Sequence, residues 1–545
     1  MTTTRFTGAF TAACLVLSVS LPPAWAQTPP TSETTPAPVL PPTQESPDAV
    51  PLSLADALRA ALENNLDIRV QRVNPAIAEQ QIQLAWSPFD PLVAADYAHS
   101  DQTTENFDLQ EPEATRKEDT FSASWADRLT FGPQYRVEVF SNRTDAPTLQ
   151  RDPLTGLLFL NPFNPTYSSG VNASFSIPLF RNLGTEVNKL DILIAESNLA
   201  VSQQELSDRV NRTLQAVEDA YWNLAAFAKA REVALQSRGL AQELLELNRR
   251  KVEVGTLAPI EITQAEAGVA EREEAVILAE TARQDAEDQL RALMAIPRDD
   301  PRWLKPIAAV EPVEFQHEEV NLQQRIDRAL STRPELEAAR RSLEARQITE
   351  RVAKHQTKPE INIVGGVNPF GNNFDVVDTN GDGVGELDRG GLGSSLSEVP
   401  SFDSYVWTLG AQFRYSIHNR APKAQLAIAS LDRQRSELDI ANLEQSISVE
   451  VRTAARGVVS GQERIAAARK NVELQERKLD AERKKFENGM STSFEVLTFQ
   501  NDLANAQLSL IRAAIDYQVA RVELERATGT LLEARGMRFD PTAGR

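Results

Sequence analysis

The sequence KVEVGTLAPIEITQAE, residues 251–266, lies between two long segments with helical periodicity. A related sequence, KFENGMSTSFEVLTFQ, occupies residues 485–500, which is 234 positions further along the chain. Gly255 in the first copy corresponds to Gly489 in the second, and Glu261 corresponds to Glu495. Glycine commonly follows the end of a helix because it adopts the left-handed conformation without strain. Each copy therefore predicts the tip of an antiparallel helical hairpin.

The starts of the two halves are also related. SLADALRAALENN begins at Ser53, and its counterpart NLQQRIDRALSTRPEL begins at Asn321. Two halves that begin and end alike predict an internally duplicated chain. The first repeat is predicted over residues 51–294, with its helical hairpin over 184–294, and the second over 321–534, with its hairpin over 420–534. The proline-rich residues 295–320 between them are predicted to form an irregular belt connector.

A seven-residue repeat of apolar positions runs through both predicted hairpins. It includes Val210, Val217 and Leu224 in the first half, and Val451 and Val458 in the second. Such a repeat is typical of helices that coil around their neighbours. A helix from about residue 184 to residue 254 would be roughly 105 Å long at 1.5 Å per residue, which no compact core reaches.

Between the helical segments, each half contains stretches in which apolar and polar residues alternate. Tyr167–Leu179 and Tyr405–Ile417 are the clearest, and aromatic residues lie near both ends of the apolar face in the second. Alternation alone also fits a half-buried strand in a soluble sandwich. Their length of about 13 residues instead favours tilted membrane strands in a β-barrel. Further strands are predicted at Leu92–Ala98, Phe121–Leu129, Gln134–Asn142 and Ile361–Val367, so that barrel strands occupy about 91–179 and 360–417.

The N-terminus predicts export from the cytoplasm. Arg5 precedes an apolar run over residues 12–21, and Ala24-Trp25-Ala26 matches a signal-peptidase site. We therefore expect a signal peptide over 1–26, followed by a Pro/Thr-rich linker over 27–50. At the other end, residues 535–545 are expected to form a C-terminal tail. No later segment has the roughly 18 consecutive apolar residues of a membrane-spanning helix, so a membrane crossing would require strands in a closed barrel.

Composition excludes several functions. Cys14, inside the predicted signal peptide, is the single cysteine, so the exported chain would have no disulfide and no thiolate ligand. The net charge of −20 argues against nucleic acid as a partner. The four histidines have no metal-ligand spacing, and neither a phosphate-binding loop nor a nucleophile elbow is present. We expect neither an enzyme nor a cofactor.

One loop has a metal-like pattern. Asp378, Asn380 and Asp382 occupy positions 1, 3 and 5 of a calcium-loop pattern, with Gly383 at position 6. The acid required at position 12 is replaced by Arg389. The hypothesis is a weak calcium site, and the alternative is a solvated surface loop between strands.

Residues 52–535 resemble the TolC-type outer-membrane efflux duct family. The resemblance is carried by the related starts, by the strand exits FSIPLFRN and FRYSIHNR that lead into long helices, and by the tips VGTLAPIEITQAEA and NGMSTSFEVLTFQNDL. It implies a mixed α and β membrane protein in which long antiparallel hairpins form an α-barrel. A transmembrane β-barrel completed by trimerisation would lie in the outer membrane of a Gram-negative-type cell, with the α-barrel in the periplasm.

The resemblance also implies partners and site residues. The homotrimer would be the exit duct of a tripartite efflux or type I secretion system, and a periplasmic adaptor and an inner-membrane pump would deliver its substrates. Gly255 and Gly489 are expected to contact the adaptor, and Glu261 and Glu495 to line the periplasmic aperture. Thr498 stands where the family places a second aperture acid, and the hairpin over residues 121–142 exceeds the family's usual four strands per subunit.

Two other classes remain as alternatives. A periplasmic structural or adaptor coiled-coil protein would also be exported, acidic and rich in heptads. The alternating, aromatic-bounded strands argue against it, because an adaptor does not need them. A secreted hydrolase has only the scattered histidines in its favour.

Overall fold

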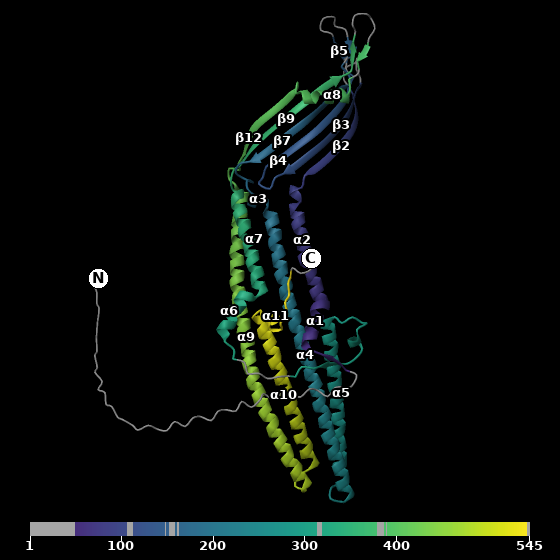
Figure 1. Ribbon diagram of the computed structural model, residues 1–545, viewed down its shortest axis with the longest axis vertical. Coiled ribbons are helices and arrows are strands. Elements are labelled where there is room, and N and C mark those ends of the chain that lie inside the picture. The colour runs from purple at the N-terminus through teal and green to yellow at the C-terminus, as the bar shows by residue number, and fades with distance from the viewer. Residues whose placement is uncertain are drawn as a thin grey trace, which may run out of the picture.

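The computed structural model describes residues 49–105, 113–147, 149–151, 158–160, 163–312, 319–378, 386–388 and 390–541. The molecule is elongated, with a β-sheet at one end and the tips of two helical hairpins at the other (Figure 1). Shorter helices lie around the middle of the long ones and form a belt, while α2 (Leu66–Trp86) and α7 (Pro334–Gln356) run beside the long helices to the sheet (Figure 1). The predicted signal peptide and almost all of the predicted linker lie outside the described residues.

Four long helices build the two hairpins. The first hairpin pairs α4 (Leu190–Glu253) with α5 (Ile260–Met294), and the second pairs α9 (Arg420–Glu487) with α10 (Ser493–Ala527). With 64 and 68 residues, α4 and α9 are each roughly 100 Å long. In the described part of the chain, no helix has both the length and the hydropathy needed to cross a membrane.

Two predicted continuous helices are interrupted. The helix expected from residue 184 divides at Lys189, between α3 (Thr185–Asn188) and α4. The second hairpin is predicted to extend to residue 534, but its long return helix ends at Ala527, because Gly529 takes the left-handed conformation with φ +69°, and α11 (Leu531–Ala534) follows.

The shorter helices pack around the long ones. In the first half they are α1 (Leu54–Asn64) and α2 (Leu66–Trp86), and in the second α6 (Leu322–Thr332) and α7 (Pro334–Gln356). The chain breaks between α1 and α2 at Asn65, whose side chain accepts hydrogen bonds from the backbone N–H groups of Asp67 and Ile68 in the first turn of α2. Pro334 at the first position of α7 separates it from α6.

The sheet contains six antiparallel strands in the order β12-β9-β7-β4-β3-β2. These strands are β2 (Leu92–Glu105), β3 (Glu113–Arg128), β4 (Gln134–Asp145), β7 (Thr166–Pro178), β9 (Glu360–Phe374) and β12 (Tyr405–Arg414). The hairpin predicted at 121–142 is therefore an integral part of the sheet, as β3 and β4. The strand predicted to reach Ile417 ends at Arg414.

The register gives the sheet two distinct faces. One row of paired residues across all six strands consists of Val93, Trp125, Val137, Ala173, Val367 and Trp407. The adjacent row lies on the opposite face and consists of Leu92, Ala126, Arg136, Ser174, Gly366 and Thr408. Every odd-numbered strand residue therefore lies on one face, called the odd face here, and every even-numbered residue on the even face. The odd face carries exposed Trp407, Leu409 and Phe413, whereas the even face is mainly polar.

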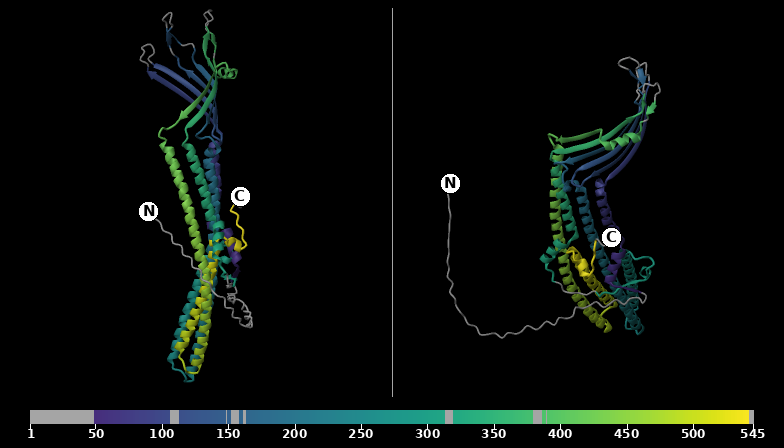
Figure 2. Two further views of the ribbon diagram at one scale, coloured as in Figure 1. Left: turned by 90° about the vertical axis from the view of Figure 1, so that its left-hand side faces the viewer. Right: turned by 45° about the horizontal axis from the view of Figure 1, so that its top comes forward.

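The even face is hollowed near the helices. Arg136, Ser174, Ser176 and Thr408 from this face line an open cavity of about 650 Å³. The two faces thus differ in polarity and in shape, and Figure 2 shows the curvature of the sheet above the helices.

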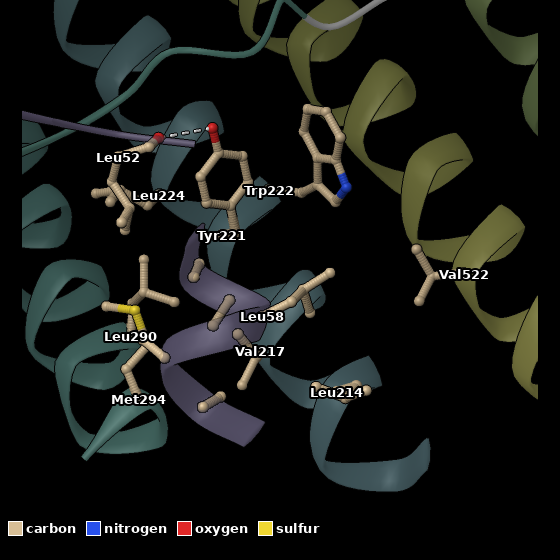
Figure 3. Close-up of a cluster of buried hydrophobic side chains, with 14 of the residues drawn as sticks. Leu52, Leu58, Leu214, Val217, Tyr221, Trp222, Leu224, Leu290, Met294 and Val522 are labelled. Atoms are coloured by element: carbon tan, nitrogen blue, oxygen red, sulfur yellow. Dashed lines mark hydrogen bonds between the residues drawn. The ribbon is translucent and has the colours of Figure 1, made fainter. Parts of the chain in front are cut away.

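The belt holds the main hydrophobic core. Leu58 of α1, Val217 and Tyr221 of α4, and Leu290 of α5 are buried together in it (Figure 3). The Tyr221 hydroxyl donates a hydrogen bond of 3.1 Å to the Leu52 carbonyl, in β1 (Val50–Leu52). The connector predicted to be irregular contains the 3-10 helix Pro301–Trp303 and β8 (Ile307–Ala309), which pairs in parallel with β1. This pairing is long-range, and local sequence does not reveal it.

Candidate functional site at the paired helical tips

Both hairpin tips end in the same helix cap. Gly255 has φ +76°, its N–H donates to the Val252 carbonyl, and the Thr256 N–H donates to the Lys251 carbonyl. Gly489 also has φ +76°, and its N–H and that of Met490 bond to the carbonyls of Phe486 and Lys485 in the same pattern. This Schellman arrangement satisfies the last carbonyls of α4 and α9. An added Cβ would meet no atom within 4 Å at either glycine, so backbone conformation and not space requires glycine there.

The two tips are joined by polar contacts. Lys251 of α4 donates a hydrogen bond of 2.8 Å to the Phe486 carbonyl at the end of α9, and its Nζ lies 4.3 Å from the centre of the Phe486 ring. Asn248 is fully buried and donates to Ser493 Oγ at 2.8 Å and to the Glu261 carbonyl at 3.1 Å. The bonds to Phe486 and Ser493 link the end of α4 to the end of α9 and to the start of α10 in the other hairpin. Sequence reasoning did not identify these two bonds, because each joins residues more than 200 positions apart.

A small apolar core supports these contacts. Leu244 of α4, Phe486 of α9, and Val496 and Leu503 of α10 are buried together. By contrast, Val254 and Ile260 at the first tip, and Met490 and Phe494 at the second, are 60–72% exposed. Each tip thus combines a supported turn with exposed apolar side chains.

Glu495 lies in the first turn of α10 and completes a capping box. The Thr492 Oγ1 accepts from the Glu495 N–H at 3.3 Å, and the Glu495 carboxylate accepts from the Thr492 N–H at 3.3 Å. Ser491 Oγ also donates to this carboxylate, at 2.7 Å. The carboxylate therefore has a local role in addition to any role in an aperture.

Glu261 lies at the equivalent position of α5, but its surroundings differ. Pro259 precedes α5 and supplies no side-chain cap, because Ala258 occupies the position that corresponds to Thr492. One carboxylate oxygen of Glu261, Oε2, is buried without a hydrogen-bond partner in the described structure. The two acids are thus alike in sequence position and different in environment.

The calcium hypothesis falls mostly outside the described residues. Asp378 ends the short strand β10 (Val376–Asp378), whereas Asn380 and Asp382 are not described. Within the residues that are described, no group of three or more His, Cys, Asp or Glu side chains is placed to hold a metal ion.

Charged groups in the belt form a second cluster that the sequence did not reveal. Arg333, at the start of α7, and Arg526 of α10 both donate to the Glu450 carboxylate of α9. Arg535 bonds to Glu218 of α4 at 2.6 Å and lies 2.9 Å from Glu525 of α10. These bonds join helices from both halves of the chain.

Asp219 of α4 differs from the ion-paired carboxylates of the belt, because its pKa is raised. Burial and the neighbouring charges of Glu218 and Glu523 raise the pKa of Asp219 to about 7, and Arg526 and Gln215 only partly oppose this shift. Its Oδ1 is buried without a hydrogen-bond partner. The protonated carboxyl is therefore favoured in the folded chain below neutral pH.

Solved structures of outer-membrane channels share this fold of two long helical hairpins that extend from an antiparallel sheet. The chain has the fold of the Campylobacter jejuni CmeC outer membrane channel, with a TM-score of 0.60 and 15% identity over 88% of this chain and 86% of that one. For CusC the TM-score is 0.63, with 16% identity over 90% and 96% of the two chains. For the open state of the Neisseria gonorrhoeae MtrE outer membrane channel the TM-score is 0.58, with 17% identity over 91% of this chain and 96% of that one.

The sequence assigns the family. The chain belongs to the outer membrane efflux protein family, which it matches over residues 57–295 and 325–530. It is 25% identical to the outer membrane efflux protein BepC of Brucella suis biovar 1 (strain 1330), over 63% of this chain and 68% of that protein. The predicted TolC-type family is confirmed, and the protein resides in the outer membrane and extends into the periplasm.

Proposed function

We propose that three copies of this chain form the exit duct of a tripartite efflux or type I secretion system. The duct passively conducts substrates, delivered by an inner-membrane pump and a periplasmic adaptor, to the cell exterior, and it catalyses no reaction. One observation carries this proposal: within the described chain, β2 and β12 are the two edges of the sheet and do not pair with each other. Open edges are not tolerated in a bilayer, so neighbouring copies must cover them.

The helices that continue from these edges support the same closure. On α2, which leads into β2, an apolar stripe is exposed at heptad spacing: Leu66, Val70, Val73, Ile77 and Leu84. On α9, which follows β12, Ile428, Leu431 and Leu438 are exposed in the same way. The two helices α2 and α9 lie on opposite sides of the chain (Figure 1). Pairing α2 of one copy with α9 of the next is a heterologous contact that closes into a ring.

Disulfide cross-linking tests this ring. Ile77 lies nine residues before the end of α2, and Ile428 lies eight residues after the start of α9, so both are roughly 13 Å from the sheet end of their helix. In a Cys14→Ala background, the double variant Ile77→Cys, Ile428→Cys should form covalent dimers and trimers on oxidation in the outer membrane. Denaturing gels without reductant measure the product.

The single variants are the matched controls, because a heterologous ring never brings two copies of one residue together. Each single variant should remain monomeric on the same gel. Ladders beyond the trimer, or dimers from a single variant, would contradict the proposed closure.

Three copies of the six-stranded sheet would supply eighteen strands. Barrels of this size enclose an aqueous channel, whereas smaller barrels are filled by side chains. The apolar odd face would contact lipid, and the polar, hollowed even face would line the channel. We further propose that the hairpins arose by internal duplication, which the identical caps at Gly255 and Gly489 support.

The tips are proposed to dock the adaptor. Gly255 and Gly489 shape the turns, and the exposed Val254, Ile260, Met490 and Phe494 supply the apolar contact area. A photo-crosslinker at Met490 should capture a periplasmic protein that co-purifies with an inner-membrane pump. A crosslinker that yields no adduct at Met490 or at Val254 would remove this role.

The aperture is proposed to be lined by Glu261 and Glu495, since rings of acids favour cations. Because the Glu495 carboxylate also caps α10, an alanine variant would disturb the helix start as well as the charge. Glu495→Gln keeps an acceptor oxygen, so we expect it to reduce cation preference in planar bilayers with little change in stability. Glu487→Gln, an exposed acid at the end of α9, is the matched control. Equal ion selectivity in both variants would exclude Glu495 from the aperture.

Two smaller proposals remain from the sequence. Asp378, Asn380 and Asp382 are proposed as a weak calcium site, and calorimetric titration of the full chain with calcium would decide it. The signal peptide over 1–26 is proposed to be cleaved, which N-terminal sequencing of the exported protein tests. No structural observation favours a periplasmic adaptor, and membership of the outer membrane efflux protein family stands against it.

A further inference from the structure

A short helix crosses the sheet at the end away from the long helices. It is α8 (Leu392–Glu398), which continues into the 3-10 turn Val399–Ser401 and lies against β9, β7 and β4 (Figure 1). Residues 392–402 are called the rim segment here. None of the roles proposed above uses this segment.

The rim segment lies on the odd face of the sheet. Ser395 Oγ is 2.8 Å from Ser169 Oγ, which is 2.6 Å from Ser141 Oγ. At Gly371 an added Cβ would lie 2.1 Å from the Ser395 carbonyl oxygen, so glycine permits the close approach of α8. Ser141, Ser169 and Gly371 form one cross-strand row, and all three are odd-numbered.

This row is the boundary between apolar and polar parts of the odd face. Towards the helices, the next rows contain residues such as Val139, Val171 and Trp407. In the opposite direction, roughly 7 Å further along the strands, the next row consists of His99, Asp119, Arg143, Tyr167 and Asn373. Its polar groups bond to one another: Asp119 accepts from Arg143 at 3.2 Å and lies 2.7 Å from His99 Nδ1. The rim segment therefore lies where the apolar band ends.

The rim segment has one apolar flank and one polar flank on either side of the surface that is buried against the sheet. At about 100° per residue, Ser395 and Val399 share the side that is buried against the sheet, and Leu392 and Leu396 lie on one flank of it. Ser394 and Glu398 lie on the opposite flank. Leu392 and Leu396 are 46% and 48% exposed, and the equally exposed Phe402 contacts Tyr405 at the top of β12.

We propose that the rim segment is an interfacial anchor that binds the outer leaflet of the membrane. Its leucine flank and Phe402 enter the acyl-chain boundary, and its Ser394 and Glu398 flank faces the aqueous phase. Lipid is the occupant because the exposed apolar residues continue the apolar odd face. A neighbouring copy would join at β2 or β12 and would not cover a helix that crosses β9, β7 and β4. The proposal rests on insertion of the sheet into the outer membrane as a barrel.

Spin labelling at single cysteines tests the anchor. In a Cys14→Ala background, the full chain with Leu396→Cys or Ser394→Cys would carry a nitroxide and be reconstituted in vesicles of phosphatidylcholine and phosphatidylglycerol. Molecular oxygen concentrates in acyl chains, whereas nickel ethylenediaminediacetate remains in water. We expect the ratio of oxygen to nickel collisions to be severalfold higher at Leu396 than at Ser394. A label at Leu392 should behave like the one at Leu396.

Two reference labels separate failure of this inference from failure of the barrel. Val137→Cys on the odd face should collide mainly with oxygen, and Asn172→Cys on the even face mainly with nickel. If Val137 and Asn172 behave alike, the proposed barrel is wrong. If those two differ but Leu396 collides mainly with nickel, or with neither reagent, the rim segment faces water or protein and the anchor is wrong.

Discussion

Glu450→Ala should destabilise the protein by about 3 kcal/mol, because it leaves two arginines without their shared carboxylate. Arg333 has a side chain only 5% exposed, and both it and Arg526 donate to Glu450. Burial alone raises the pKa of Glu450, but the hydrogen bonds from these arginines outweigh burial and hold the pKa below its usual range. The contribution of this carboxylate to stability is therefore present at neutral pH and is lost as the pH falls through its lowered pKa.

Glu444→Ala on the same helix is the matched control. Its ion pair with Arg340 is 3.6 Å long and exposed on both sides, so its loss should change stability by at most about 1 kcal/mol. The midpoint of thermal unfolding of the detergent-solubilised protein at pH 7.5 compares the two variants. Equal midpoints for Glu450→Ala and Glu444→Ala would show that the belt does not depend on this cluster.

Asp219→Asn should have the opposite effect and stabilise the protein at alkaline pH. The pKa of Asp219 is about 7 in the folded chain, against 3.8 for an unperturbed aspartate. Because the pKa of Asp219 is higher in the folded chain than in the unfolded chain, its ionisation lowers the free energy of unfolding. This stability is complete below the pKa of the unfolded chain and is lost as the pH rises through the pKa of the folded chain. The loss is at most a few kcal/mol by pH 8, since each unit of pKa shift corresponds to about 1.4 kcal/mol. The side-chain amide of the Asp219→Asn variant is neutral at every pH, so the variant does not lose this stability at alkaline pH.

The measurement compares unfolding midpoints of wild type and Asp219→Asn at pH 4.5 and pH 8. The variant should gain stability relative to wild type at pH 8 and little at pH 4.5. Asp516→Asn on α10, where the exposed carboxylate pairs with Arg464 at 2.8 Å, should show no such gain. An unchanged difference between the two pH values would mean that Asp219 is hydrated in the assembled duct.

The strands show what periodicity can predict. Alternation located all six strands of the sheet, because strand side chains point alternately to the two faces and each face has its own environment. It also assigned the apolar residues of β7 and β12 to one face. The ends were less accurate: β12 is shorter than predicted, and β2 and β9 are longer, because ladder pairing with a neighbour and not local pattern sets the length of a strand.

At the hairpin tips, the sequence predicts the helix ends but not the contacts between the two hairpins. Gly255 and Gly489 could be predicted as helix ends, since the left-handed conformation is a local property. The roles of Lys251, Asn248 and Ser493 could not, because each depends on a residue from the other hairpin. Glu261 and Glu495 occupy corresponding positions in the two copies, yet only Glu495 caps its helix, because Thr492 precedes it where Ala258 precedes Glu261. The substitution of alanine for threonine at this position is the signal in the sequence that distinguishes the two acids.

The long helices, their two glycine tips and the alternating strands can be predicted from the amino-acid sequence, because helix periodicity, glycine conformation and strand alternation are properties of neighbouring residues. The strand order, the assignment of odd-numbered and even-numbered residues to the two faces of the whole sheet, the pairing of β1 with β8 and the charge cluster around Glu450 are visible only in the folded structure. The folded structure also places the rim segment on the apolar face. These features join residues that are far apart in the chain, and their free energy depends on burial and charge that exist only once the chain is folded.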